Sequence, residues 1–242
     1  MFLKIIIVLT ILPVLVFTLV FVLPHVYGRF SRIFLARRCR RAGALVLTYD
    51  DGPGAILTPE LIGLLRHHAT KATFFCLGMR AALNPSIMNL VKSEGHELAC
   101  HSYRHCHPWR VRPTAAIRDI DDGFESLSRW LSPDSLFRPP HGKLTLYTWL
   151  VLLARRARIV WWTHDSGDTW KNGPPSVDDF VEGVIRCGGG VVLLHDFDRG
   201  NDEESDSRRE FVLSVTKSLI EKSGLAGLKV MTLGELFNTK KV

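Results

Sequence analysis

The chain has 242 residues and a formal net charge of +7, with 46% apolar and 23% charged residues, as in an ordinary globular protein. This composition excludes a disordered chain, and the lack of a repeat at a fixed period excludes a solenoid. The positive excess lies before residue 50 and the remainder is balanced, so no nucleic-acid partner is expected.

The first predicted element is an apolar helix. Residues 5–23 carry no charge and consist mainly of Ile, Val, Leu and Phe, a run long enough to span the hydrocarbon core of a bilayer. A cleaved signal peptide is the competing interpretation, but its apolar region is usually shorter and the small-residue site ending at Gly28 is weak. We therefore expect residues 1–28 to form a retained transmembrane anchor.

An arginine-rich segment follows. Residues 29–42 hold six arginines and no acidic residue, a composition that is attracted to anionic lipid headgroups. We expect this segment to be a juxtamembrane linker and the membrane to be a partner. The positive-inside rule places a domain after such a flank in the cytoplasm, and the odd number of cysteines suits reduced thiols.

From residue 43 to 242, short apolar runs alternate with amphipathic stretches, which is typical of βα units in a single domain. The pattern predicts a parallel sheet or barrel. The expected strands are 44–49, 72–77, 97–100, 136–138, 159–163, 191–194 and 229–232.

Helices are predicted between these strands. Pro59 follows Thr58 as at the first position of a helix, residues 114–131 place apolar side chains on one face, and Ser176 with Asp179 resembles a capping box. Residues 198–209 are polar and highly charged, so they are expected to form a surface loop, such as a lid over a site.

Polar clusters follow the predicted strands. In an α/β barrel the reactive groups lie at the carboxyl ends of the strands, where these clusters fall. They are residues 48–53, 101–105, 138–142, 165–170 and 194–196.

Each cluster alone has an ordinary structural explanation. An Asp-Asp-Gly-Pro string is commonly a turn, and a histidine at a strand end is more often a satisfied core residue than a catalyst. Together they indicate more, because one of two adjacent carboxylates can bind a metal while the other takes a proton. Asp51 with His101 and His105 makes an open three-ligand site of the kind used by hydrolytic zinc proteins.

The clusters, in this order, resemble the motifs of the polysaccharide deacetylases of carbohydrate esterase family 4, also called the NodB-homology family. They read Thr-Tyr-Asp-Asp-Gly-Pro, His-Ser-Tyr-Arg-His, Arg-Pro-Pro-His, Asp-Ser-Gly-Asp-Thr-Trp and Leu-His, and the resemblance extends from Ala44 to about Phe237. It implies an α/β fold, a distorted (β/α)7 barrel, which here follows an N-terminal transmembrane helix.

The resemblance also implies site roles. Asp51, His101 and His105 would be the metal ligands, Asp50 the general base and His195 the general acid. Zn²⁺ is the expected metal, and Co²⁺ or Ni²⁺ also suits such ligands.

Further residues would support these groups. Arg138 would pair with the base, and Asp168, with Asp165 as second choice, would orient the catalytic histidine. The backbone N–H of His141 would stabilise the oxyanion, and Leu194 with Trp170 would wall the pocket for the acetyl methyl.

Three residues depart from the family pattern. Tyr49 stands where Phe is commoner, His141 where Tyr is frequent, and Thr169 separates Asp168 from Trp170. No catalytic group is lost, although the fit of the substrate around His141 stays open.

The expected function is metal-dependent removal of N-acetyl groups from an N-acetylglucosamine-containing glycan, chitin-like or peptidoglycan. Deacylation of a membrane lipid-linked amino sugar is the enzymatic alternative. A catalytically inactive carbohydrate-binding barrel is the other one, since a fold alone does not fix a function. The family habit, often extracytoplasmic, opposes the cytoplasmic location that the arginine-rich flank favours.

Overall fold

The structure is a computed structural model that describes residues 2–132, 135–200 and 203–239. A curled, all-parallel sheet of eight strands forms its centre, in the order β5-β4-β3-β2-β1-β7-β6, with β8 paired to the start of β1. The strands are β1 (Ala44–Asp50), β2 (Thr73–Cys76), β3 (Glu97–Cys100), β4 (Leu136–Phe137), β5 (Arg158–Ile159), β6 (His164–Asp165), β7 (Gly190–His195) and β8 (Lys229–Val230).

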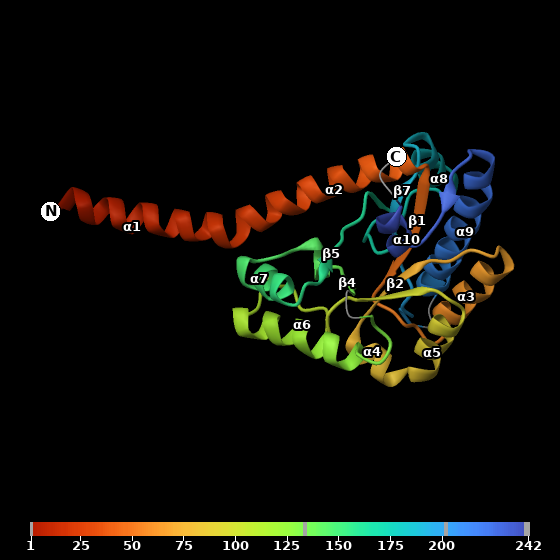
Figure 1. Cartoon of the computed structure of the whole chain (residues 1–242), viewed down its shortest axis with the longest axis horizontal. Coiled ribbons are helices and arrows are strands. Elements are labelled where there is room, and N and C mark those ends of the chain that lie inside the picture. The colour runs from red at the N-terminus through yellow and green to blue at the C-terminus, as the bar shows by residue number, and fades with distance from the viewer. Residues whose placement is uncertain (1, 133–134, 201–202, 240–242) are drawn as a thin grey trace.

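Helices pack around this sheet and extend from it (Figure 1). They are α1 (Phe2–Phe17), the π-helical turn η1 (Thr18–Val22), α2 (Leu23–Ala42), α3 (Leu57–His67), α4 (Gly78–Leu83), α5 (Pro85–Ser93), α6 (Pro113–Leu127), the 3₁₀ turn η2 (Pro140–Gly142), α7 (Leu146–Ala154), α8 (Val177–Arg186), α9 (Glu203–Leu225) and α10 (Leu233–Asn238).

The sheet has a separate core on each face. Leu45, Leu47 and Tyr49 of β1 belong to the larger cluster, together with residues of the covering helices. The alternate residues Ala44 and Val46 belong to a smaller cluster inside the curl. This alternation leaves Asp50 on the inner face at the carboxyl end of β1, where the site is formed.

The apolar N-terminal helix continues into the domain. One helix long and apolar enough to cross a membrane is found at residues 10–42, by length and composition. Its second half, α2, packs on the domain: Leu35 and Cys39 are buried in the inner core. The absence of a side chain at Gly28 allows close packing, since a Cβ there would lie 3.1 Å from the Trp161 ring.

The arginine-rich segment is therefore helical and partly structural. Arg38 donates hydrogen bonds to the carbonyls of Leu236 and Phe237 at the end of α10, at 3.0 and 2.9 Å. Arg32 lies 4.5 Å from the centre of the Trp162 ring. The segment expected to be a linker thus forms part of the folded domain.

Most other predicted elements are confirmed to within a few residues of their ends, although Pro59 is the third residue of α3 and not the first. Two further elements differ. The strand expected at 159–163 is replaced by β5 and β6, which occupy opposite edges of the sheet and leave the barrel open between them. The prediction of a loop at residues 198–209 is wrong from Glu203 onward, because α9 begins at that residue. Ser176 caps α8 as expected, because its hydroxyl accepts the N–H of Asp179 at 3.1 Å.

Candidate metal and catalytic site

The structure brings Asp51, His101 and His105 together at the carboxyl ends of β1 and β3. Asp51 Oδ1 lies 3.5 Å from His101 Nε2 and 3.4 Å from His105 Nε2. This oxygen is buried and has no hydrogen-bond partner among the described residues. A buried carboxylate oxygen without a donor is costly, so the arrangement fits a divalent cation bound to these three side chains.

Hydrogen bonding orients the imidazole of His101. Its Nδ1 lies 2.7 Å from the carbonyl oxygen of Arg138, so Nδ1 carries the proton and donates it. The lone pair of Nε2 is then free to bind a metal. Burial holds the pKa of His101 well below its usual value, which favours the neutral imidazole that a metal requires.

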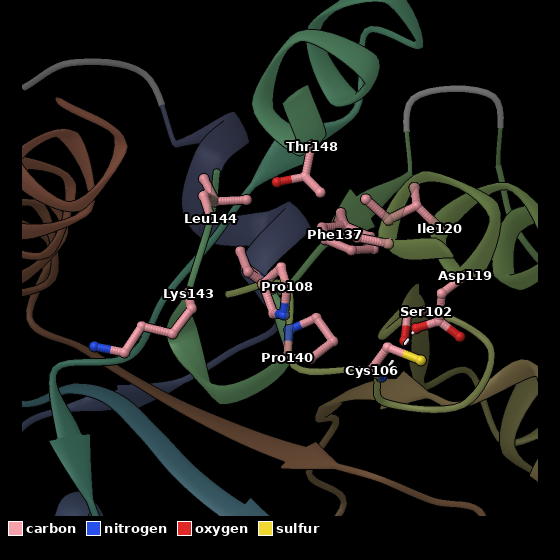
Figure 2. A pocket seen from close by; sticks show the side chains of 12 residues that line it. Ser102, Cys106, Pro108, Asp119, Ile120, Phe137, Pro140, Lys143, Leu144 and Thr148 are labelled. Carbon is pink, nitrogen blue, oxygen red and sulfur yellow. Dashed lines mark hydrogen bonds between the residues drawn. The ribbon is translucent and has the colours of Figure 1, made fainter. Parts of the chain in front are cut away.

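A tight loop positions His105. Its backbone is left-handed, with φ of 62°, and its N–H donates to the Ser102 hydroxyl at 3.1 Å. Asp119 of α6 holds the same loop, because its carboxylate accepts the N–H groups of Arg104 and Cys106 at 2.7 and 3.1 Å. Figure 2 shows Asp119 beside Ser102 and Cys106 at one end of a small pocket behind the loop.

Asp50 and Arg138 form a buried ion pair beside the three ligands. Arg138 NH1 donates to Asp50 Oδ1 at 2.7 Å and to the Thr48 hydroxyl at 2.8 Å, while its NH2 reaches the carbonyl of Trp161. Burial raises the pKa of Asp50, and the guanidinium of Arg138 opposes that rise. The second oxygen, Oδ2, lies 3.6 Å from His101 Nε2 and faces the ligands.

His195 and Asp168 form a second pair. His195 Nδ1 lies 2.9 Å from Asp168 Oδ1, and the His195 backbone N–H donates to Oδ2 at 3.1 Å. Burial lowers the pKa of His195, but the carboxylates of Asp168, Asp51 and Asp50 together raise it to about 9, with Asp168 contributing most. Asp165 instead accepts the N–H of Gly167 at 3.0 Å. The residue in contact with His195 is thus Asp168.

Of the residues expected to contact substrate, His141 lies beside the proposed metal ligands, whereas Trp170 lies in an exposed loop. The His141 ring packs against His105 and His107, with centroids 4.3 and 4.6 Å apart, so it forms one side of the site. Trp170 is half-exposed in the loop after Asp168, and its ring lies against Gly167.

Leu194 does not lie where it was expected. It is fully buried in the outer core with Tyr49, its partner in the β1–β7 register. Side chains alternate along a strand, so the residue on the same face as His195 is Leu193, opposite Thr48. Leu193, and not Leu194, is therefore the leucine on the face of β7 that carries His195.

Sequence reasoning missed supporting residues. Asp119 is an acidic residue on the otherwise apolar face of α6. This exception to the apolar pattern could have indicated from the sequence that Asp119 has a structural or functional role. Arg199 NH2 lies 3.2 Å from Asp168 Oδ2, a contact across the fold that no local pattern predicts. Tyr49 keeps a packing role, as expected, stacking on Phe74 and sharing a hydrogen bond with the Thr216 hydroxyl.

Comparisons with known proteins agree on the family. A family model described as polysaccharide deacetylase matches residues 37–162. A peptidoglycan-N-acetylglucosamine deacetylase of Bacillus cereus is 32% identical over 199 residues, covering 81% of this chain and 89% of that protein. A chitooligosaccharide deacetylase of Bradyrhizobium is 31% identical, covering 63% and 70%.

Solved structures show the same fold. The crystal structure of a peptidoglycan N-acetylglucosamine deacetylase in complex with a hydroxamate-type benzamide superposes with a TM-score of 0.71 at 28% identity, covering 82% of this chain and 90% of that one. A family 4 carbohydrate esterase from Streptomyces lividans, in complex with acetate, gives 0.61 at 30% identity, covering 74% and 89%.

Proposed function

Because this chain belongs to the polysaccharide deacetylase family, we propose that it is a metal-dependent hydrolase that removes N-acetyl groups from N-acetylglucosamine units of a glycan. The observation that carries the metal dependence is the buried, unpartnered Oδ1 of Asp51 between two imidazole nitrogens. A divalent cation bound there, Zn²⁺ by preference and Co²⁺ or Ni²⁺ as substitutes, would acidify water and polarise the amide carbonyl.

Asp50 would take the proton of the attacking water. Its raised pKa makes the carboxylate a stronger base, while the ion pair with Arg138 keeps its Oδ1 fixed. Oδ2, the oxygen that Arg138 does not bind, would receive the proton. Arg138 is itself fully buried and therefore holds Asp50 in a single orientation.

His195 would give a proton to the departing amine. Burial alone raises the pKa of Asp168, but the adjacent His195 and Arg199 lower it overall, so Asp168 stays ionised. Its charge keeps His195 protonated at neutral pH, which is the state that a general acid needs. His141, which follows β4, and Leu193 of β7 would border the acetyl group from two separate strands of the sheet.

Acetate release from N-acetylglucosamine oligomers tests this function. The full chain in detergent would be assayed as purified, after chelation, and after zinc is restored, with Asp51→Asn as the variant that lacks one ligand. We expect chelation and Asp51→Asn each to abolish release, and zinc to restore only the wild type. Release that survives chelation would refute the metal dependence.

We further propose that the N-terminal helix is a retained membrane anchor. Residues 11–17 include large apolar side chains that are about half exposed, and water is a poor solvent for them. The second half of the same helix supplies core residues to the domain. Cleavage near Gly28 would remove residues that pack against Trp161, so retention suits the fold better than cleavage.

The position of the site favours a second candidate substrate, a membrane lipid-linked amino sugar. His105 is separated from Trp109 by three residues, and the Trp109 ring lies 5.6 Å from that of Phe21 in η1. The loop that carries His105 therefore continues into a contact with the N-terminal helix. A vesicle assay with a lipid-linked N-acetylglucosamine, compared with soluble oligomers, distinguishes the two substrates by their relative rates.

A further inference from the structure

Helix α7 has an unusual surface for a helix on the outside of a domain. Its nine residues, Leu146–Ala154, include no charged side chain. Thr148 and Leu152 face the core, whereas Tyr147, Leu150 and Leu153 are 40%, 54% and 53% exposed. Exposed residues at spacings of three share one face of a helix, so α7 presents an apolar strip outward. Single exposed leucines are ordinary, but a strip of this kind indicates a contact surface.

This strip lies beside the N-terminal helix. Figure 1 shows α7 at the end of the domain from which α1 extends, and η1 packs against α7. Trp109 lies at the same level: it contacts Phe21 and remains 37% exposed, and its indole N–H donates to the Leu144 carbonyl at 2.7 Å. We call Trp109, Tyr147, Leu150 and Leu153 the apolar collar.

The length of the helix places the collar at the edge of a bilayer. An α-helix rises about 1.5 Å per residue, so about 20 residues cover a hydrocarbon core of roughly 30 Å. Counted from Ile5, the first residue of the uncharged run, this length ends near Pro24, at the start of α2. Phe21 and its partner Trp109 then lie at the membrane interface, where Trp and Tyr are enriched.

Basic side chains adjoin the collar, as at a surface of anionic lipid. Lys143 Nζ lies 4.6 Å from the centre of the Trp109 ring. Arg29, the first arginine after the apolar run, is exposed on α2, and Arg110 and Arg112 are exposed on either side of residue 111. Long basic side chains of this kind extend towards headgroups while their stems cover apolar surface.

From these observations we propose that the apolar collar is a membrane-seated surface, which inserts into the headgroup boundary of the bilayer that the N-terminal helix spans. The proposal rests on the helix being an anchor, and it adds a second contact, made by the domain itself. A helix alone permits the domain to tilt and rotate, whereas a helix and a collar fix its orientation. The site, which lies next to the collar through His141 and Lys143, would then face the membrane surface.

Photo-crosslinking tests the collar directly. A benzophenone amino acid would replace Leu150 or Leu153 in the full chain, reconstituted in vesicles of phosphatidylcholine and phosphatidylglycerol. Leu225, which is 91% exposed at the end of α9, is the matched soluble control, and Leu15 of α1 is the control for the anchor. After irradiation, lipid adducts would be measured by mass spectrometry.

We expect lipid adducts at positions 150 and 153 at about tenfold the yield at position 225. Side chains inserted in the bilayer contact lipid, whereas the side chain at position 225 faces water. Adducts at 15 but only background at 150 and 153 would overturn the collar and leave the anchor standing. Background at 15 as well would refute the anchor. Crosslinks from 150 or 153 to a second copy of the chain would also overturn the proposal, since the surface would then be a dimer contact.

Discussion

Replacing Asp168 with Asn tests whether Asp168 keeps His195 protonated and so able to act as the proton donor. The Asp168 carboxylate lies 2.9 Å from His195 Nδ1. Burial lowers the pKa of His195, but the charges of Asp168, Asp51 and Asp50, with the hydrogen bond to Asp168, together raise it to about 9. A general acid works only while protonated, so the rate of the wild type should fall as the pH rises through about 9. Without the carboxylate, burial remains and lowers the pKa of His195.

The expected shift is large. Asp168 makes the largest contributions that raise this pKa, while Asp51 and Asp50 would still raise it in the variant, so the high-pH limb should move down by about 1–2 units, equivalent to ~1.5–3 kcal/mol of lost stabilisation of the imidazolium. Acetate release measured from pH 5 to 10 would show this limb. The rate at neutral pH should fall as well, because a smaller fraction of His195 would then be protonated.

Asp165→Asn is the matched control. It removes a carboxylate three residues earlier in the chain, at the end of β6. Asp165 accepts the N–H of Gly167 and interacts with His195 only through its charge, without a hydrogen bond. Its high-pH limb should therefore shift by less than half as much as that of Asp168→Asn. If both variants shifted the limb equally, or if Asp168→Asn left it in place, the assignment of Asp168 and His195 as the proton-donating pair would be wrong.

Other variants test the neighbouring parts of the site and fold. Asp50→Asn should keep zinc affinity within about threefold while lowering the rate at least ~100-fold, as calorimetry and acetate release would show, and near-normal turnover would remove Asp50 from the role of base. Asp119→Asn, compared with the exposed Asp121→Asn, should weaken zinc binding about 10-fold because the His105 loop loses an acceptor, and equal affinities would contradict this. Leu35→Ala should lower the free energy of unfolding by about 2–4 kcal/mol in chemical denaturation, and a loss below ~0.5 would show that α2 is not part of the core.

The elements predicted correctly are those with clear local signals. β1 and β7 are continuous apolar runs buried on both faces, which identifies them by composition alone. Because these runs do not alternate between polar and apolar residues, the sequence does not indicate which face of the sheet each residue occupies. Leu193 and Leu194 look alike in such a strand, and only the two-residue period counted back from His195 assigns Leu193 to the site.

Elements with mixed signals were mispredicted for physical reasons. The first turns of α9 are charged on all sides, and its buried residues begin at Phe211, so its start reads as a loop. Residues 29–42 read as a linker because arginines dominate them, yet Leu35 and Cys39 lie four apart on one buried face. Arginine side chains such as Arg38 find carbonyl partners that only the folded chain supplies.

The site divides in the same way. The proposed ligands and proton-transfer residues occur in short motifs at strand ends, and the structure places their side chains close together, as the motifs predicted. The groups that orient them come from elsewhere: Arg199 follows β7 and reaches Asp168, and Asp119 is on a helix. Such contacts depend on packing between distant segments and have no signature at fixed spacing.

Contacts continue without a break from the N-terminal helix to the proposed base. Gly28 of α2 lies against the ring of Trp161, the Trp161 carbonyl accepts from Arg138 NH2 at 3.2 Å, and Arg138 NH1 binds Asp50 at 2.7 Å. An anchor joined through a flexible linker would have no such connection. Here the helix proposed to cross the membrane also supports the wall behind the site. The orientation of the helix in a bilayer therefore fixes the direction in which the site opens, and with it the distance from the membrane at which a glycan can be reached.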